Sequence, residues 1–240
     1  MRVTFFKSLQ LLSEAAAEEI VTQALASVAE QGIFSLVLTG GQTPGLLYEI
    51  FGSEPFAGRM PWRQTHLFWG DERCVSPENP ASNYRLAREA FLEKGHVPEA
   101  NIHRMAGENP DPVQAARDYD KDLRDFFHKH SRLSAPRFDC LLLGMGGDGH
   151  IASLFPGSTL LAEKNDWVAA LPEPAGSPML PRITLTLPAL QRARKTIFLI
   201  SGEKKRAIFT EITGEKSRAQ KKYPAALLEP EGELVWFIAE

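Results

Sequence analysis

The sequence of 240 residues lacks the features that mark several classes of protein. It has only two cysteines, Cys74 and Cys140, and neither stands in a paired motif. No apolar run approaches the length that crosses a membrane, and charge interrupts the first residues too early for a signal peptide. We therefore expect reduced thiols in a cytoplasmic protein with no membrane partner, although the sequence does not exclude a disulfide bond between the two cysteines.

A strong excess of charge is also absent. The chain has 27 basic and 30 acidic residues, a formal net charge of −3, which gives no electrostatic reason to expect a nucleic-acid partner. The hydrophobic content of 43% is ordinary for a globular protein, and no shift in composition marks a boundary. We expect a single domain over residues 1–240, and the sequence does not indicate an oligomeric state.

Patterns typical of metal sites and of nucleophilic serine enzymes are missing as well. No G-x-S-x-G motif occurs, so a serine nucleophile of that kind has no support. Apart from His150, which is discussed below, the histidines have no partners at metal-ligand spacing. These histidines are His66, His96, His103, His128 and His130. We expect neither a metal nor another cofactor.

Apolar periodicity predicts strands that alternate with helices. Residues at helical spacing follow Ser8, a good N-cap, and continue until Gly32, a good helix end. Further helices are expected at residues 46–51, from 82 onward, at 113–128 and at 204–212. Strands are expected at residues 3–6, 34–38, 65–69, 138–143, 183–187, 196–201 and 234–238, with a long proline-rich connection at 171–181. This alternation indicates an α/β fold with a largely parallel sheet covered on both faces.

The most informative run extends from residue 138 to residue 150. An apolar, strand-like segment leads into a loop with four glycines, and that loop carries Asp148 and His150. Dense glycines let the backbone come close to a ligand, and α/β proteins place their chemistry at the carboxyl ends of strands. A histidine two residues from an aspartate is typical of a general base with a partner that orients it. We therefore predict the centre of an active site here.

The same run matches the dinucleotide-binding pattern G-x-G-x-x-G through Gly144, Gly146 and Gly149. That reading requires the third glycine to open a long helix inside a βαβ unit. Here Pro156 and Gly157 follow closely and leave little room for such a helix. The pattern therefore gives only weak support for a nicotinamide site.

A second glycine loop spans residues 39–44 and connects an expected strand to an expected helix. Its amide hydrogens and the helix dipole can converge on an anion, most naturally a phosphate. Gly40 and Gly45 have the spacing of a P-loop, but Leu46 and Leu47 stand where lysine and serine or threonine are required. This disfavours nucleoside triphosphates, and a tight turn with no ligand stays open as the alternative.

Charged residues follow two other expected elements. Asp71, Glu72 and Arg73 come after a strand, where they could serve acid–base chemistry, bind sugar hydroxyls, or form a solvated turn closed by a salt bridge. The motif alone favours the solvated turn. Arg182 and Lys204 are ordinary surface charge or the cations of a phosphate pocket.

Five blocks in order, spread over nearly the whole chain, resemble the signatures of the 6-phosphogluconolactonase family. They are residues 39–44, 69–73, 83–84, 144–157 and 182–184. The resemblance implies a modified Rossmann-like three-layer α/β sandwich with a mainly parallel sheet, shared with glucosamine-6-phosphate deaminase. It also implies hydrolysis of 6-phospho-D-glucono-1,5-lactone to 6-phospho-D-gluconate, in the oxidative pentose phosphate pathway, without a metal.

The resemblance also implies roles for individual residues. His150 would deprotonate a water molecule, Asp148 would set its orientation or charge, and Asp71 would be a further catalytic group. Arg73 would either join the phosphate clamp or stabilise the oxyanion, and the sequence does not decide between these roles. The remaining residues implied in substrate and phosphate binding are Gly40, Gly41, Gln42, Thr43, Gly149, Arg182 and Lys204.

Two rival functions are disfavoured by particular positions. The deaminase family has an Asn-Glu pair where this chain has Leu154 and Phe155, and phenylalanine cannot transfer a proton. A sugar-phosphate sensor of this superfamily would usually be joined to a DNA-binding helix-turn-helix, but no basic segment precedes Val3. The sequence therefore predicts a lactonase.

Overall fold

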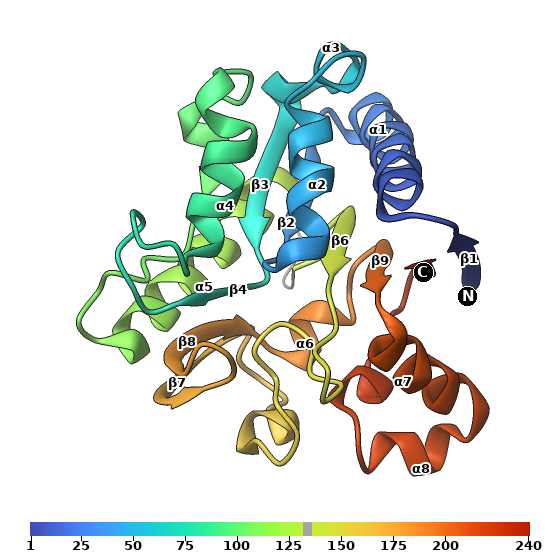
Figure 1. Cartoon of the computed structure of the whole chain (residues 1–240). Coiled ribbons are helices and arrows are strands. Elements are labelled where there is room, and N and C mark those ends of the chain that lie inside the picture. Colours follow the sequence, from blue (N-terminus) through green and yellow to red (C-terminus); the bar gives the residue numbers. More distant parts are fainter. Residues whose placement is uncertain (132–135) are drawn as a thin grey trace.

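A seven-stranded sheet runs through the centre of the structure (Figure 1). The computed structural model describes residues 1–131 and 136–240. The strand order is β1-β10-β9-β6-β2-β3-β5, and all neighbours are parallel, so the prediction of a mainly parallel sheet is confirmed. The strands are β1 (Arg2–Phe6), β2 (Phe34–Leu38), β3 (Thr65–Trp69), β5 (Ile102–His103), β6 (Cys140–Leu143), β9 (Lys195–Ser201) and β10 (Glu233–Ala239).

A second, antiparallel sheet of three strands lies beside the first, in the order β4-β8-β7. Its strands are β4 (Asp71–Arg73), β7 (Val168–Ala175) and β8 (Leu180–Leu185). The expected long connection at residues 171–181 is therefore wrong, because these residues belong to a β7–β8 hairpin. Pro172 and Pro174 fall on the outer strand, where the register shifts between Leu171 and Ala175, and prolines are tolerated at such edges and bulges.

Alternate residues of each central strand enter two separate cores. On β2, Leu36 and Leu38 belong to one core, whereas Val37 belongs to the other, as the two-residue period of a strand requires. The first core lies beneath α1 (Leu9–Gln31), α2 (Gln42–Phe51) and α4 (Asn83–Ala90). The second lies beneath α5 (Pro112–Ser131), α7 (Glu203–Gly214) and the small sheet. This confirms the three-layer α/β sandwich.

The helix boundaries agree with the local sequence signals at α1 and differ from them at α2. The Ser8 side chain accepts a hydrogen bond from the Leu11 amide, and Gly32 ends α1 in the left-handed conformation. Helix α2 begins at Gln42 rather than near Leu46, and its first turn tolerates Pro44 because amides there have no partner within the helix. The shorter elements are α3 (Phe56–Arg59), α6 (Leu187–Leu190), α8 (Lys216–Gln220) and 3₁₀ turns at Trp62–Gln64, Leu92–Lys94, Glu99–Asn101, Thr159–Ala162 and Pro224–Leu227.

Loops from distant parts of the chain meet at the carboxyl ends of the central strands. The glycine loop follows β2, the histidine loop follows β6, and the start of α7 follows β9. Residues 150–158 form turns and an isolated bridge, so no long helix follows the histidine loop. The structure therefore adds no support for a dinucleotide site. Both cysteines are free thiols, with Cys140 buried in β6. Within the described ranges, no helix is long and apolar enough to cross a membrane.

Candidate active site

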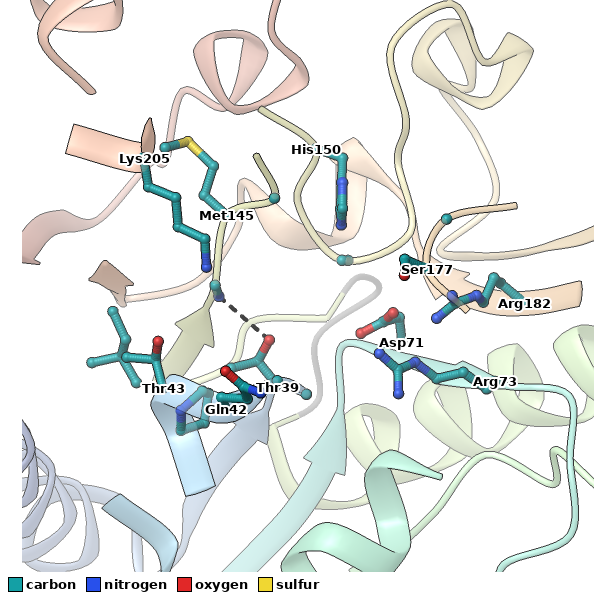
Figure 2. A pocket seen from close by; sticks show the side chains of 18 of the residues that line it. Thr39, Gln42, Thr43, Asp71, Arg73, Met145, His150, Ser177, Arg182 and Lys205 are labelled. Carbon is teal, nitrogen blue, oxygen red and sulfur yellow. Dashed lines mark hydrogen bonds between the residues drawn. The ribbon is translucent and has the colours of Figure 1, made fainter. Parts of the chain in front are cut away.

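A polar pocket opens where these loops meet (Figure 2). Its walls come from the glycine loop and α2, from β4, from the histidine loop, from the β7–β8 hairpin and from α7. Most residues of the predicted site line it, so the fold brings together motifs that lie far apart in the sequence. The predicted residues in its wall are Gly40, Gly41, Gln42, Thr43, Asp71, Arg73, His150 and Arg182.

Asp148 fixes the tautomer and the direction of the His150 ring. The distance between His150 Nδ1 and Asp148 Oδ1 is 2.5 Å, and the His150 amide donates to the same oxygen at 3.2 Å. Partial burial acts to raise the pKa of Asp148, but its electrostatic interaction with the His150 ring and these hydrogen bonds outweigh burial and lower the pKa below its ordinary value. Because the carboxylate is ionised and accepts, Nδ1 carries the hydrogen, and Nε2 keeps a lone pair for the pocket.

The pair requires a glycine at position 146. A Cβ atom there would lie 2.1 Å from His150 Nδ1 and 2.7 Å from Asp148 Oδ1, which is far inside van der Waals contact. The Phe155 ring also packs against the imidazole, with the two ring centroids 4.5 Å apart. Glycine and phenylalanine thus confine the imidazole, and Figure 2 shows it pointing into the pocket on the side of Asp71.

One end of the pocket is the amino terminus of α2. Its N-cap, Gly41, has φ 105° and provides no side-chain cap, so the first amides of the helix are available to an anion. Thr43 Oγ1 lies 2.8 Å from Ser201 Oγ and joins the start of α2 to the end of β9. Figure 2 shows the Lys205 ammonium pointing toward the same region, so amides, helix dipole and cation converge there.

Of two adjacent lysines, the fold places Lys205 in the pocket wall and not the predicted Lys204. Lys205 lines the pocket, whereas Lys204 is exposed and lies against Gly147 on the outer side of the histidine loop. Successive helical residues point about 100° apart, so only one of two adjacent lysines can face inward. The signal was available in the sequence, because Lys205 precedes the buried Ile208 and Phe209 by three and four positions and shares their face.

The other end of the pocket holds two arginines on adjacent strands. Arg73 of β4 is the register partner of Arg182 of β8, and neither arginine forms an ion pair within the described ranges. Arg182 donates to the carbonyl oxygens of Ala175 and Pro178, and the buried Arg73 Nε has no hydrogen-bond partner among the residues that the structure describes. Burial and the Arg73 charge lower the pKa of Arg182, although an arginine stays charged at neutral pH. Two neighbouring cations of this kind favour an anionic group between them.

The two carboxylates before Arg73 are buried, so the interpretation as a solvated turn is wrong. Asp71 is 6% exposed and Glu72 is 2% exposed. Glu72 accepts hydrogen bonds from the amides of Asn83 and Tyr84 at the start of α4, and burial nevertheless raises its pKa. Glu72 therefore supports the fold, whereas Asp71 lines the pocket.

Gly149 supports the loop rather than the pocket wall. It has φ 79°, a Cβ atom there would lie 2.4 Å from the Tyr223 ring, and its carbonyl accepts from the Ala225 amide. Besides Lys205, several residues of the pocket wall were not predicted as site residues, among them Met145, Ala152, Phe155 and Ser177. Ala152 is the one non-glycine residue of the described chain with positive φ, at 47°. This unusual backbone conformation is visible in the structure but not in the sequence.

Three histidines without an expected role come together away from the pocket. His66 Nδ1 and His103 Nε2 lie 3.0 Å apart, with ring centroids 5.3 Å apart, so the two rings meet edge to edge in an N–H···N hydrogen bond. The His130 ring packs against His66. Among residues 1–131 and 136–240, no group of three or more histidine, cysteine or acidic side chains is arranged to hold a metal ion.

Comparison with known proteins agrees with the motifs. The family model for glucosamine-6-phosphate isomerases/6-phosphogluconolactonase matches residues 7–236. The chain is 40% identical over 229 residues to a 6-phosphogluconolactonase of Synechocystis sp. strain PCC 6803, covering 95% of this chain and 91% of that protein. The chain belongs to this family.

The family assignment extends to the three-dimensional fold. The structure resembles that of 6-phosphogluconolactonase from Thermotoga maritima with a TM-score of 0.84 and 29% identity, covering 100% of this chain and 99% of the other. One relative, from Arabidopsis thaliana, is named as chloroplastic. It is 34% identical over 214 residues, covering 87% of this chain and 64% of that protein. The cytoplasmic location therefore stays a prediction.

Proposed function

We propose that this pocket hydrolyses 6-phospho-D-glucono-1,5-lactone to 6-phospho-D-gluconate, as in the oxidative pentose phosphate pathway. The observation that carries the proposal is the His150–Asp148 pair, whose free Nε2 faces a pocket with a cationic group at each end. The product has an anion at each end as well, the phosphate on C6 and the carboxylate that forms at C1. A pocket with two cationic ends and a base beside one of them suits such a molecule.

The α2 end holds the phosphate in this proposal. Helix-terminal amides at Gln42 and Thr43 donate to the phosphate oxygens, and Lys205 supplies a full positive charge. The C1 carbonyl then lies at the opposite end, beside His150, Arg73 and Arg182, where Figure 2 shows these side chains grouped with Asp71. This orientation assigns the arginines to the reacting end and not to the phosphate.

In the first step, water attacks C1 of the lactone. His150 Nε2 takes a proton from the water as the new C1–O bond forms, and the electron pair of the carbonyl moves onto its oxygen. Asp148 stabilises the resulting imidazolium through Nδ1–H. Asp71, across the pocket from His150, accepts a hydrogen bond from the other O–H of the water and so orients it. The arginine pair stabilises the oxyanion.

In the second step, the tetrahedral intermediate collapses. The C1=O bond re-forms, the bond between C1 and the ring oxygen breaks, and the ring oxygen takes the proton from His150 Nε2. The open-chain acid then loses its proton and leaves as the carboxylate. The histidine returns to its neutral state, so each turnover consumes one lactone and one water.

Deamination of glucosamine 6-phosphate, the other activity in the family's name, has less support. The position at which the deaminase family is expected to carry glutamate is Phe155, whose ring packs on His150. A phenyl ring neither transfers a proton nor stabilises an imidazolium through a charge.

The proposal is tested with freshly prepared 6-phosphogluconolactone. The purified protein should accelerate loss of the lactone above the spontaneous rate, at the same rate in excess chelator as without it. Release of ammonia from glucosamine 6-phosphate is measured in parallel and should be absent. Ammonia release without lactone hydrolysis would overturn the proposal.

A further inference from the structure

Asp71 stands beside two arginines without pairing with either. None of the ion pairs within the described ranges includes Asp71, although its charge acts on Arg182 of the neighbouring strand. A buried carboxylate close to a guanidinium that has no ion-pair partner gains energy by forming a bidentate contact with it. Other contacts must therefore hold Asp71 in its observed orientation.

Two side chains provide those contacts. Ser153 Oγ donates to Asp71 Oδ2 at 2.7 Å, and Asn83 Nδ2 donates to Asp71 Oδ1 at 3.3 Å and to the Asp71 carbonyl at 2.8 Å. The contact from Ser153 is the shorter of those to the carboxylate, and Ser153 is completely buried. Its own amide donates to Thr184 Oγ1 on β8, which fixes the backbone from which the hydroxyl reaches.

We propose that Ser153 is a positioning residue for the reaction: its hydroxyl holds the Asp71 carboxylate in the pocket wall and keeps it from pairing with Arg73 or Arg182. Ser153 lies three residues after His150 on the same loop, so this hydrogen bond ties the base to the carboxylate that faces it. The inference rests on the proposed function, because Asp71 there orients the attacking water.

The hydrogen bond from Ser153 affects both the attacking water and the two arginines. A carboxylate released from Ser153 would turn to the arginines, withdraw from the water and neutralise part of the charge that stabilises the oxyanion. Both effects act on the transition state, whereas the phosphate is held at the other end of the pocket. Loss of the hydroxyl should therefore lower kcat and leave KM almost unchanged.

The test compares Ser153→Ala with Ser35→Ala. Ser35 Oγ donates to the buried Asp139 Oδ2 at the same distance of 2.7 Å, but at the opposite end of the sheet. Both variants should lose thermal stability, because each leaves a buried carboxylate short of a donor. Only Ser153→Ala should lose kcat, by roughly ten- to a hundred-fold, the range of one charge-assisted hydrogen bond, with KM changed less than about three-fold.

Asp71→Asn shows whether Ser153 acts through Asp71. The double variant Ser153→Ala/Asp71→Asn should have the kcat of Asp71→Asn alone within about two-fold, because residues that act as one unit are not additive. A double variant whose loss is the product of the two single losses would overturn the inference, as would wild-type kcat in Ser153→Ala. If Ser153→Ala does not fold, Ser153→Cys avoids a cavity and replaces the hydroxyl by a weaker donor, and the same measurements of kcat and KM apply to it.

A crystal structure of Ser153→Ala separates this inference from the proposed function. The Asp71 carboxylate should be turned toward Arg182 or Arg73 in the variant, whichever lactone or amine the wild-type protein consumes. An Asp71 that keeps its orientation would overturn the positioning role. Absence of lactone hydrolysis by the wild-type protein would overturn the proposed function instead.

Discussion

Replacing Lys205 by alanine removes the only full positive charge that we place at the phosphate end of the pocket. Lys205 is half-buried, and burial lowers its pKa because the charged ammonium is partly removed from water. A bound phosphate would stabilise the ammonium and offset this loss of hydration. A charge-assisted contact contributes about 1.5–3 kcal/mol, or on the order of ten- to a hundred-fold in affinity. The amides of α2 remain in the variant, so binding should weaken without being lost.

The expected result follows from where the contact lies. The phosphate is bound alike in the ground state and the transition state, so Lys205→Ala should raise KM by roughly ten- to a hundred-fold and change kcat little. The ratio of catalytic efficiencies on 6-phosphogluconolactone and on unphosphorylated gluconolactone should fall by the same factor. The measurement is initial rates on both lactones, with spontaneous hydrolysis subtracted.

Lys204→Ala is the matched control. It removes the same charge from the adjacent position, which lies outside the pocket against Gly147. The ratio for this variant should stay within about two-fold of the wild-type value. If Lys204→Ala loses the preference for the phosphorylated lactone and Lys205→Ala keeps it, the placement of the phosphate at the start of α2 is refuted.

Three further predictions concern the base, its glycine and a histidine pair. His150→Ala should lower kcat by about two to four orders of magnitude with KM little changed, the usual cost of losing a general base; near-wild-type turnover would remove His150 from the mechanism. Gly146→Ala should lower kcat at least about ten-fold by displacing the pair beside it, while its far-UV circular dichroism stays that of the wild type. An unchanged kcat would mean that the pair tolerates the displacement. The pKa values of His66 and His103 are lowered to about 4, by burial first, so the unfolded chain binds protons before the folded one as the pH falls. Stability should thus decline from about pH 6.5 to about pH 4. Thermal midpoints of His66→Gln/His103→Gln should decline less over this range, and an equal decline would assign it to other groups.

The sequence alone determined the local structure and the two central loops. The spacing of apolar residues and the capping residues Ser8 and Gly32 located α1, because helix ends depend on a few neighbouring residues. The alternation of strands and helices sufficed for a parallel sheet, since parallel strands need crossover connections. The glycine density around Asp148 and His150 indicated the loop that lines the pocket, because close backbone approach is a local requirement.

Only the tertiary structure decided which charges share the pocket. Strand register places Arg73 opposite Arg182, and the hydrogen bond from Ser153 reaches Asp71 across 82 positions of sequence. The orientation of α7 selects Lys205 over Lys204, although both have the same chemistry. Strand order and pairing register arise from packing over the whole chain and leave no trace in a local pattern. The rotation of α7 is indicated locally only by Ile208 and Phe209, which follow Lys205 by three and four positions.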